Sequence, residues 1–158
     1  MRLPASPLNP QFFAYGSLPI YLLGLVAYGF SAIWPAAGQL DNLHLVGRPL
    51  AILFDLGTIY LTYRLARRLF SESGTSRQAK ALALLSAGLV SVAVLQIQLA
   101  HFYTVDPLLT FFVMLALNLA SDVAQCTKRA YHLGLGAVVG LAVATKLSAI
   151  PLVLIIPV

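Results

Sequence analysis

One acidic turn lies between two long apolar runs, at residues 101–107 (HFYTVDP). Asp106 is the only charged residue between Ala81 and Ser121. A carboxylate at the edge of a membrane helix is costly to place there, so it usually has a function. It could bind a divalent cation such as Mg or Mn, or polarise a hydroxyl group. It could also only cap the helix that begins at Pro107, because an acid before a proline suits a helix start.

His101 stands five residues before Asp106. Its imidazole could orient the carboxylate, or bind the same metal or phosphate. A lone histidine beside aromatic residues is more often an anchor at the membrane interface. We take Asp106 and His101 as the candidate catalytic residues, with Asp106 as the candidate metal ligand.

Two cations are candidates for binding a phosphate. Arg48 precedes Pro49 at the start of an apolar run, and arginine recognises phosphate through paired hydrogen bonds. The alternative is an arginine that reaches lipid headgroups along its apolar stem. Lys146 is surrounded by apolar residues, and a lysine at the rim of a membrane generally needs an anionic partner.

The composition identifies the class of protein. Of 158 residues, 59% are hydrophobic and 9% are charged, against about 25% charged in average soluble domains. So few charges cannot cover a water-exposed globule, so we expect an all-α integral membrane protein. The net charge of +5 does not indicate nucleic acid, because the basic residues form no patch with interleaved aromatics. Cys126 is the only cysteine, which excludes an internal disulfide.

Apolar segments with turn residues between them predict a multi-span helical bundle. The segments are 18–37, 49–65, 79–100, 107–120 and 133–149, with an unfinished sixth at 151–158. This length allows about four to five spans plus a juxtamembrane helix. The first segment could span the membrane or lie along its outer surface. The unfinished last run predicts a fragment of a larger protein, and Gly136 and Gly140 predict close helix packing.

The basic residues predict the orientation. Two groups lie between segments two and three and between segments four and five: Arg64, Arg67, Arg68, Arg77 and Lys80, then Lys128 and Arg129. The positive-inside rule places both connections in the cytoplasm, so the other turns face outward. Lys146 then lies about 22 Å along a helix from Tyr131, near the outer boundary. One outer face would therefore collect the mixed polar residues: Asp41, His44, Arg48, His101, Asp106 and Lys146.

Two other classes of function compete with a catalytic site. Asp55 lies deep in segment two, where a lone charge must point into the bundle, and we expect it to bond to another helix. A transporter or flippase half would instead use Asp55, Asp106 and Lys146 as an ion relay, but the chain has no convincing internal repeat. In an assembly subunit, Asp106→Asn would change stability and not activity.

Several motifs resemble those of bacterial family 39 glycosyltransferases. These are C-type membrane enzymes related to dolichyl-phosphate-mannose protein mannosyltransferases and aminoarabinose transferases. Each motif alone is weak, but their order and spacing along nearly the whole chain are fairly specific. The motifs are residues 9–22 (NPQFFAYGSLPIYL), 45–48 (LVGR), 54–58 (FDLGT), 97–107 (IQLAHFYTVDP) and 140–146 (GLAVATK).

The resemblance implies transfer of a hexose or pentose from a polyprenyl-phosphate carrier to an acceptor, at the outer face of the cytoplasmic (inner) membrane. Asp106 matches an acidic position that helps to position metal or donor phosphate. Lys146 matches a lysine near the carrier phosphate, and Arg48 matches an arginine that opens a span. Where aminoarabinose transferases have Lys-Pro, this chain has residues 15–19 (YGSLP), and we assign Tyr15 to substrate binding.

The family also carries an Asp-Glu motif in its first outer loop, whose aspartate acts as general base. That motif would precede Asn9 and is absent here, so we expect this chain to be inactive by itself. The resemblance implies a single membrane domain over residues 1–158. Residues 1–48 would form an outer loop with a juxtamembrane helix, and residues 49–158 the transmembrane helices.

Overall fold

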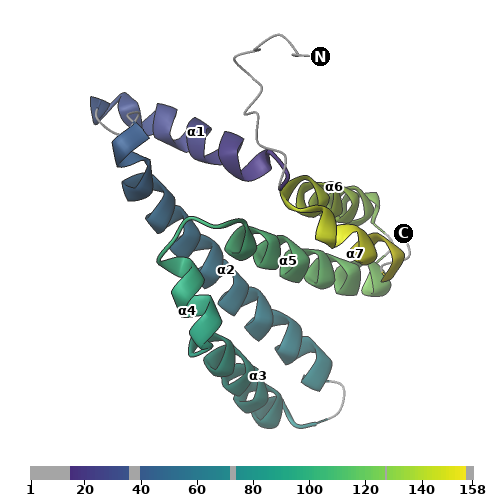
Figure 1. The fold of residues 1–158 in the computed structure, drawn as a ribbon. Coiled ribbons are helices and arrows are strands. Elements are labelled where there is room, and N and C mark those ends of the chain that lie inside the picture. The colour runs from purple at the N-terminus through teal and green to yellow at the C-terminus, as the bar shows by residue number, and fades with distance from the viewer. Residues whose placement is uncertain (1–14, 36–39, 72–73, 127, 156–158) are drawn as a thin grey trace.

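The computed structural model describes residues 15–35, 40–71, 74–126 and 128–155, and every regular element in this part is helical (Figure 1). The expected all-α fold is therefore confirmed. The helices are α1 (Leu18–Ser31), α2 (Leu43–Ser71), α3 (Ser76–Ser91), α4 (Val94–Ala100), α5 (Val105–Gln125), α6 (Arg129–Thr145) and α7 (Ile150–Ile155), with short 3-10 turns η2 (Leu40–Asn42) and η3 (Leu147–Ala149).

Two helices of the described part, α2 and α5, are long and apolar enough to cross a membrane. Their 29 and 21 residues correspond to about 44 Å and about 32 Å of helix. Large apolar side chains remain exposed on α2, including Leu53 at 63% and Leu56 at 57%, as a lipid-facing surface requires. The expected number of four to five spans remains a prediction, since α3 and α6 have 16 and 17 residues.

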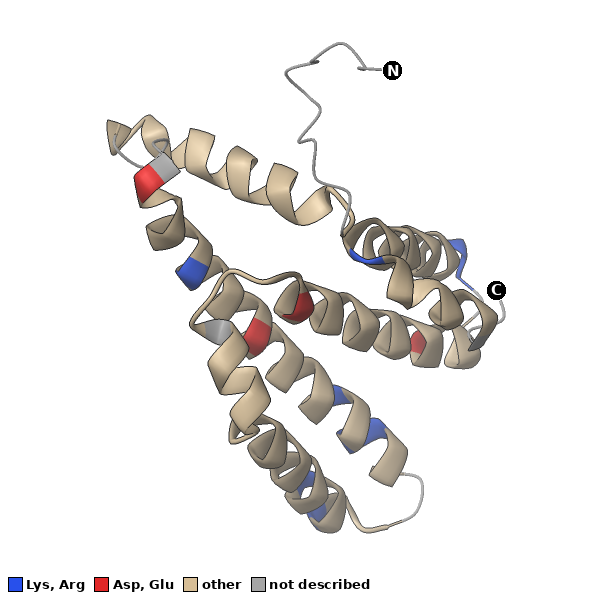
Figure 2. Ribbon diagram, in the orientation of Figure 1, with Lys and Arg blue, Asp and Glu red and all other residues tan. Residues whose placement is uncertain are grey.

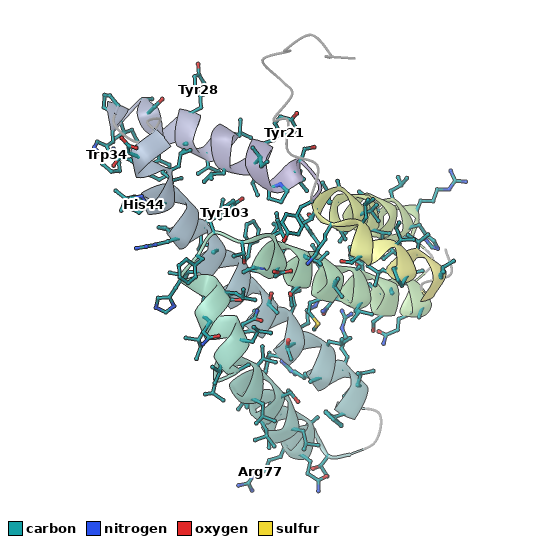
Figure 3. All side chains as sticks on the ribbon, viewed as in Figure 1. Tyr21, Tyr28, Trp34, His44, Arg77 and Tyr103 are labelled. Atoms are coloured by element: carbon teal, nitrogen blue, oxygen red, sulfur yellow. The ribbon has the colours of Figure 1, made fainter. Side chains whose placement is uncertain are left out.

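The first apolar segment is a short helix. The 14 residues of α1 reach about 21 Å, less than a hydrocarbon core of about 30 Å. It runs across one end of α2 (Figure 1), with Tyr21 and Tyr28 on the side that points away from the bundle (Figure 3). These features agree with a juxtamembrane helix better than with a span.

The second and third segments differ from the expected boundaries. The second begins at Leu43 and continues through Pro49, which a membrane helix tolerates because neighbouring groups satisfy the freed carbonyl. The third, expected as one segment over 79–100, is divided at Ala93, which has extended backbone angles. β-Branched residues near this position lower the helix propensity. The Ser91 hydroxyl also donates to the Gly88 carbonyl oxygen at 2.8 Å, and this side-chain hydrogen bond competes with the backbone hydrogen bonds of the helix.

Small residues let α3 lie along α2 as an antiparallel pair (Figure 1). Ala79, Ala83 and Ala87 recur every four residues on one face of α3, and all three are buried. Such a stripe allows two helix backbones to approach closely, which favours association where both helices are surrounded by lipid. The packing of α3 along α2 thereby stabilises the position of α2.

The central helix is α5, which packs against both α2 and α6. Apolar residues of α5 and α6 form one core cluster, which includes Leu108, Phe112, Ala116, Leu135, Val138 and Ala142. Asn118 is fully buried and donates to the Leu61 carbonyl oxygen of α2 at 3.1 Å. Packing on both sides fixes the two ends of α5.

The Gly136–Gly140 pair does not contact a neighbouring helix within the described residues. No atom lies within 4 Å of a Cβ added at either glycine, because α6 turns its other face to α5. The expectation of close packing at this pair is therefore wrong for the described part of the chain.

Each end of α5 carries an aspartate (Figure 2). Each of these aspartates pairs with a cation from another segment. Asp106 in the first turn pairs with Lys146, and Asp122 in the last turn pairs with Arg64 and Arg68 of α2. The two aspartates are about 24 Å apart along the helix, close to the thickness of a hydrocarbon core. The ion pairs therefore suit opposite interfaces of one membrane.

We predict that Asp122→Ala destabilises the bundle. Asp122 is buried, and its carboxylate oxygens lie 3.1 Å from Arg64 Nη2 and 2.5 Å from Arg68 Nη2. Its removal leaves two guanidinium groups without their carboxylate, and we expect the free energy of unfolding to fall by roughly 2 kcal/mol, less than for a fully buried pair. Thermal unfolding in detergent measures this change, with the exposed Asp41→Ala as control. Equal melting curves for the two variants would contradict the prediction.

Candidate functional site

Lys146 stands where α6 stops. The helix ends at Thr145, and Lys146 follows in an extended conformation before η3 begins. The side-chain Nζ donates to Oδ1 of Asp106 at 3.0 Å. The side chains are 30% and 40% exposed, so the ion pair is both held by the fold and open to a ligand.

The carboxylate of Asp106 is not the helix cap. The helix α5 begins at Val105, with Thr104 as its N-cap residue and no side-chain capping hydrogen bond. Asp106 lies within the first turn, where the helix dipole still favours a negative charge. The interpretation of Asp106 as a cap and nothing more is therefore wrong, because its carboxylate pairs with Lys146.

Tyr15 lies beside the same lysine. Lys146 Nζ is 5.4 Å from the centre of the Tyr15 ring, within the range of a cation–π contact. The neighbouring Gly16 N–H donates to the Thr145 carbonyl oxygen at 3.1 Å. A Cβ added at Gly16 would lie 1.8 Å from the Ala144 carbonyl oxygen, so only glycine allows this approach. Gly16 thus brings the chain before α1 against the end of α6.

Tyr103 joins the turn before α5 to α1. Its hydroxyl donates to the Pro19 carbonyl oxygen at 2.8 Å, and it lies on the side of the bundle that faces α1 (Figure 3). Burial raises the pKa of Tyr103 to about 12, so the hydroxyl remains a neutral donor at ordinary pH. A Cβ added at Gly47 would lie 2.7 Å from Tyr103 Cβ, so this glycine lets α2 approach the turn.

A pocket of about 340 Å³ opens between these elements, within the usual size of ligand sites. The Thr104 hydroxyl in its wall is buried and has no hydrogen-bond partner among the described residues. The pocket thus combines aromatic rings, an unsatisfied hydroxyl and the Asp106 carboxylate, which pairs with Lys146 outside the lining. Its lining residues are Tyr15, Pro19, Ile20, Tyr103, Thr104, Val105 and Asp106.

Three predicted site residues are not in this lining: Lys146, His101 and Arg48. Lys146 is joined to the pocket through its ion pair with Asp106. His101 is exposed at the end of α4, and its Nδ1 lies 2.7 Å from the Ile97 carbonyl oxygen. Arg48 is exposed on α2 and takes part in none of the ion pairs found in the described part of the chain. The structure therefore brings Asp106, Lys146 and Tyr15 together, without His101 or Arg48.

Asp106 as a ligand of Mg or Mn remains a prediction. No group of three or more His, Cys, Asp or Glu side chains lies together in the described ranges. One or two carboxylates can hold Mg when water and a substrate phosphate supply the other ligands. Asp106 would therefore need such further ligands, and one of its oxygens already accepts a hydrogen bond from Lys146.

Asp55 has the structural partner that its depth predicts. The Gln96 side-chain amide donates to its carboxylate, which joins α2 to α4. No ion pair links Asp55 to Asp106 or Lys146 among the described residues.

The comparison with protein families adds the decisive observation. A model described as dolichyl-phosphate-mannose-protein mannosyltransferase matches residues 39–157. The chain belongs to this family. The resemblance to C-type membrane glycosyltransferases is thereby confirmed, and the mannosyltransferase-family match includes Asp106 and Lys146 but not Tyr15. Searches of curated proteins and of solved structures found no match.

Proposed function

We propose that this mannosyltransferase-family protein transfers a hexose or pentose from a polyprenyl-phosphate carrier to an acceptor, at the outer face of the cytoplasmic membrane. The observation that carries the proposal is the half-exposed Lys146–Asp106 ion pair beside the pocket before α5. The basic ends of α2 and α3 lie at the other end of the bundle (Figure 2), which supports an outward-facing pocket.

The reaction explains why a lysine belongs at this position. The bond from the anomeric carbon to the carrier phosphate breaks, a bond to the acceptor oxygen forms, and the acceptor proton passes to a base. Negative charge grows on the phosphate as the sugar leaves, and a fixed ammonium group stabilises that charge. Lys146 pairs with the Asp106 carboxylate that lines the pocket, so we assign it the contact with the leaving phosphate.

Asp106 and Tyr15 would hold the lysine ready. Before the donor binds, the Asp106 carboxylate and the Tyr15 ring fix the ammonium group from two sides. The arriving phosphate would then bind the ammonium group of Lys146 together with the carboxylate or in its place. The ion pair allows this exchange because both side chains are partly exposed to water and an exposed pair is weak. Ile20 and Val105 give the pocket an apolar wall, suited to the first isoprene units of the carrier.

We predict that Asp106→Asn lowers sugar transfer. Asparagine keeps the size of the side chain and removes the charge that orients Lys146, so we expect the turnover rate to fall about tenfold or more. The full-length protein, reconstituted with radiolabelled polyprenyl-phosphate sugars, gives the rate, and the exposed Asp41→Asn is the matched control.

Two outcomes would count against this function. Equal turnover by the wild type and Asp106→Asn would remove Asp106 from the site. A folded wild type that consumes no donor of any kind would contradict sugar transfer and favour the ion-relay alternative.

A further inference from the structure

A second pocket, of about 400 Å³, lies on α2 at the end of the bundle opposite Lys146. Its lining residues recur three and four positions apart, so they share one face of the helix. They are Tyr60, Tyr63, Arg64, Arg67, Arg68 and Ser71.

This pocket carries a surplus of positive charge. Three guanidinium groups line it, and the Asp122 carboxylate that pairs with Arg64 and Arg68 offsets only one of them. Arg67 is exposed and takes part in none of the ion pairs of the described residues. Arg68 Nη1 is buried without a hydrogen-bond partner in the same part of the chain. An anionic ligand would balance this charge and could accept from the unpartnered Arg68 Nη1.

The fixed geometry of the arginines suits a phosphate. Asp122 holds two guanidinium groups in place, at 3.1 Å and 2.5 Å, so less side-chain freedom is lost when a ligand binds. Guanidinium groups recognise phosphate oxygens through paired, charge-assisted hydrogen bonds, which an ammonium group cannot reproduce.

We propose that this pocket binds the phosphate of an anionic phospholipid in the leaflet at this end of the bundle. The pocket continues from Arg64 to Tyr60, about 6 Å further along the span, where the aromatic side chain is 63% exposed. A ligand that fills it therefore needs an anionic head and an apolar continuation. Basic pockets at the ends of membrane helices bind such headgroups, and tyrosines are enriched at that depth.

This lipid site is separate from the proposed sugar-transfer pocket. The aspartates that mark the two sites, Asp106 and Asp122, are about 24 Å apart along α5. The proposal needs only the membrane location of the family, and its test measures lipid binding without any sugar donor. Its failure would therefore leave the proposed function untouched.

The test compares Arg67→Gln with Arg77→Gln in the full-length protein. Arg67 lines the pocket without pairing to Asp122, so its replacement leaves the fold intact. Arg77 is an exposed arginine in the first turn of α3, outside the pocket lining (Figure 3). Native mass spectrometry of the detergent-solubilised protein, titrated with phosphatidylglycerol or phosphatidylcholine, measures the bound lipid.

We expect the wild type to prefer phosphatidylglycerol, and Arg67→Gln to bind it about fivefold more weakly, with Arg77→Gln unchanged. Inorganic phosphate at the same concentration should not displace the lipid. Equal losses in both variants would show diffuse attraction and overturn the proposal, as would equal binding of the two lipids. Displacement by inorganic phosphate alone would overturn the assignment to a lipid.

Discussion

Lys146→Ala should remove most of the ability to use a polyprenyl-phosphate sugar while the bundle stays folded. The ammonium group of this lysine lies 3.0 Å from the carboxylate of Asp106, which lines the pocket before α5. Removing one preorganised group that stabilises developing charge lowers the rate constant about 100- to 1,000-fold. We expect a loss of at least about 100-fold in kcat/KM, measured with radiolabelled donor in reconstituted full-length protein.

Conservative and distant variants make this prediction specific. Lys146→Arg keeps the positive charge and should recover part of the lost rate. Lys128→Ala removes an exposed lysine at the other end of α6 and should behave as the wild type. If Lys146→Ala raises only KM, the ammonium binds the ground-state phosphate and does not act on the leaving group. If it changes neither parameter, Lys146 is not in the site.

The double variant tests whether Asp106 acts through Lys146. Residues that work as a unit have non-additive effects, so Asp106→Asn with Lys146→Ala should be no slower than Lys146→Ala alone. An additive loss would show that Asp106 acts independently of the lysine, for example on the acceptor.

The helical class could be predicted from the sequence because the membrane allows few alternatives. In lipid, a chain with so many apolar residues must satisfy its backbone hydrogen bonds within helices. The helix boundaries could not be predicted from hydropathy alone. The break at Ala93 and the passage of α2 through Pro49 depend on local backbone competition and on neighbouring helices, and both occur inside continuous apolar runs.

The sequence identified the charged residues of the site but not which of them form ion pairs. Asp106 and Lys146 stand out because each is isolated among apolar residues, but 40 positions separate them. Their contact depends on the packing of α5 against α6 and on the end of α6 at Thr145. Arg64 and Arg68 were assigned to a cytoplasmic connection, whereas the structure places them inside α2 and against Asp122.

Gly16 was missed at the sequence level because nothing nearby marks its role. Its importance comes from Ala144 and Thr145, far along the chain, whose carbonyl groups lie where a side chain would be. A glycine that permits a close approach of two backbones has the same appearance in sequence as one in an ordinary turn.

Gly16→Ala should therefore disable the pocket without unfolding the helices. The added Cβ would lie 1.8 Å from the Ala144 carbonyl oxygen, so the chain before α1 must move away from α6. That movement breaks the 3.1 Å hydrogen bond from Gly16 to Thr145 and separates the Tyr15 ring from Lys146. Displacements of about 1 Å in a catalytic site can lower rates about 100-fold, and we expect a loss of that order in sugar transfer.

Gly24→Ala is the matched control, since no atom lies within 4 Å of a Cβ added there. In the middle of α1, alanine should stabilise the helix slightly and leave transfer unchanged. Thermal unfolding in detergent separates loss of the pocket from loss of the fold, because α2, α5 and α6 pack together without Gly16. Wild-type transfer by Gly16→Ala would show that the Tyr15 segment is not needed, and Asp106 alone would then position Lys146 for the phosphate.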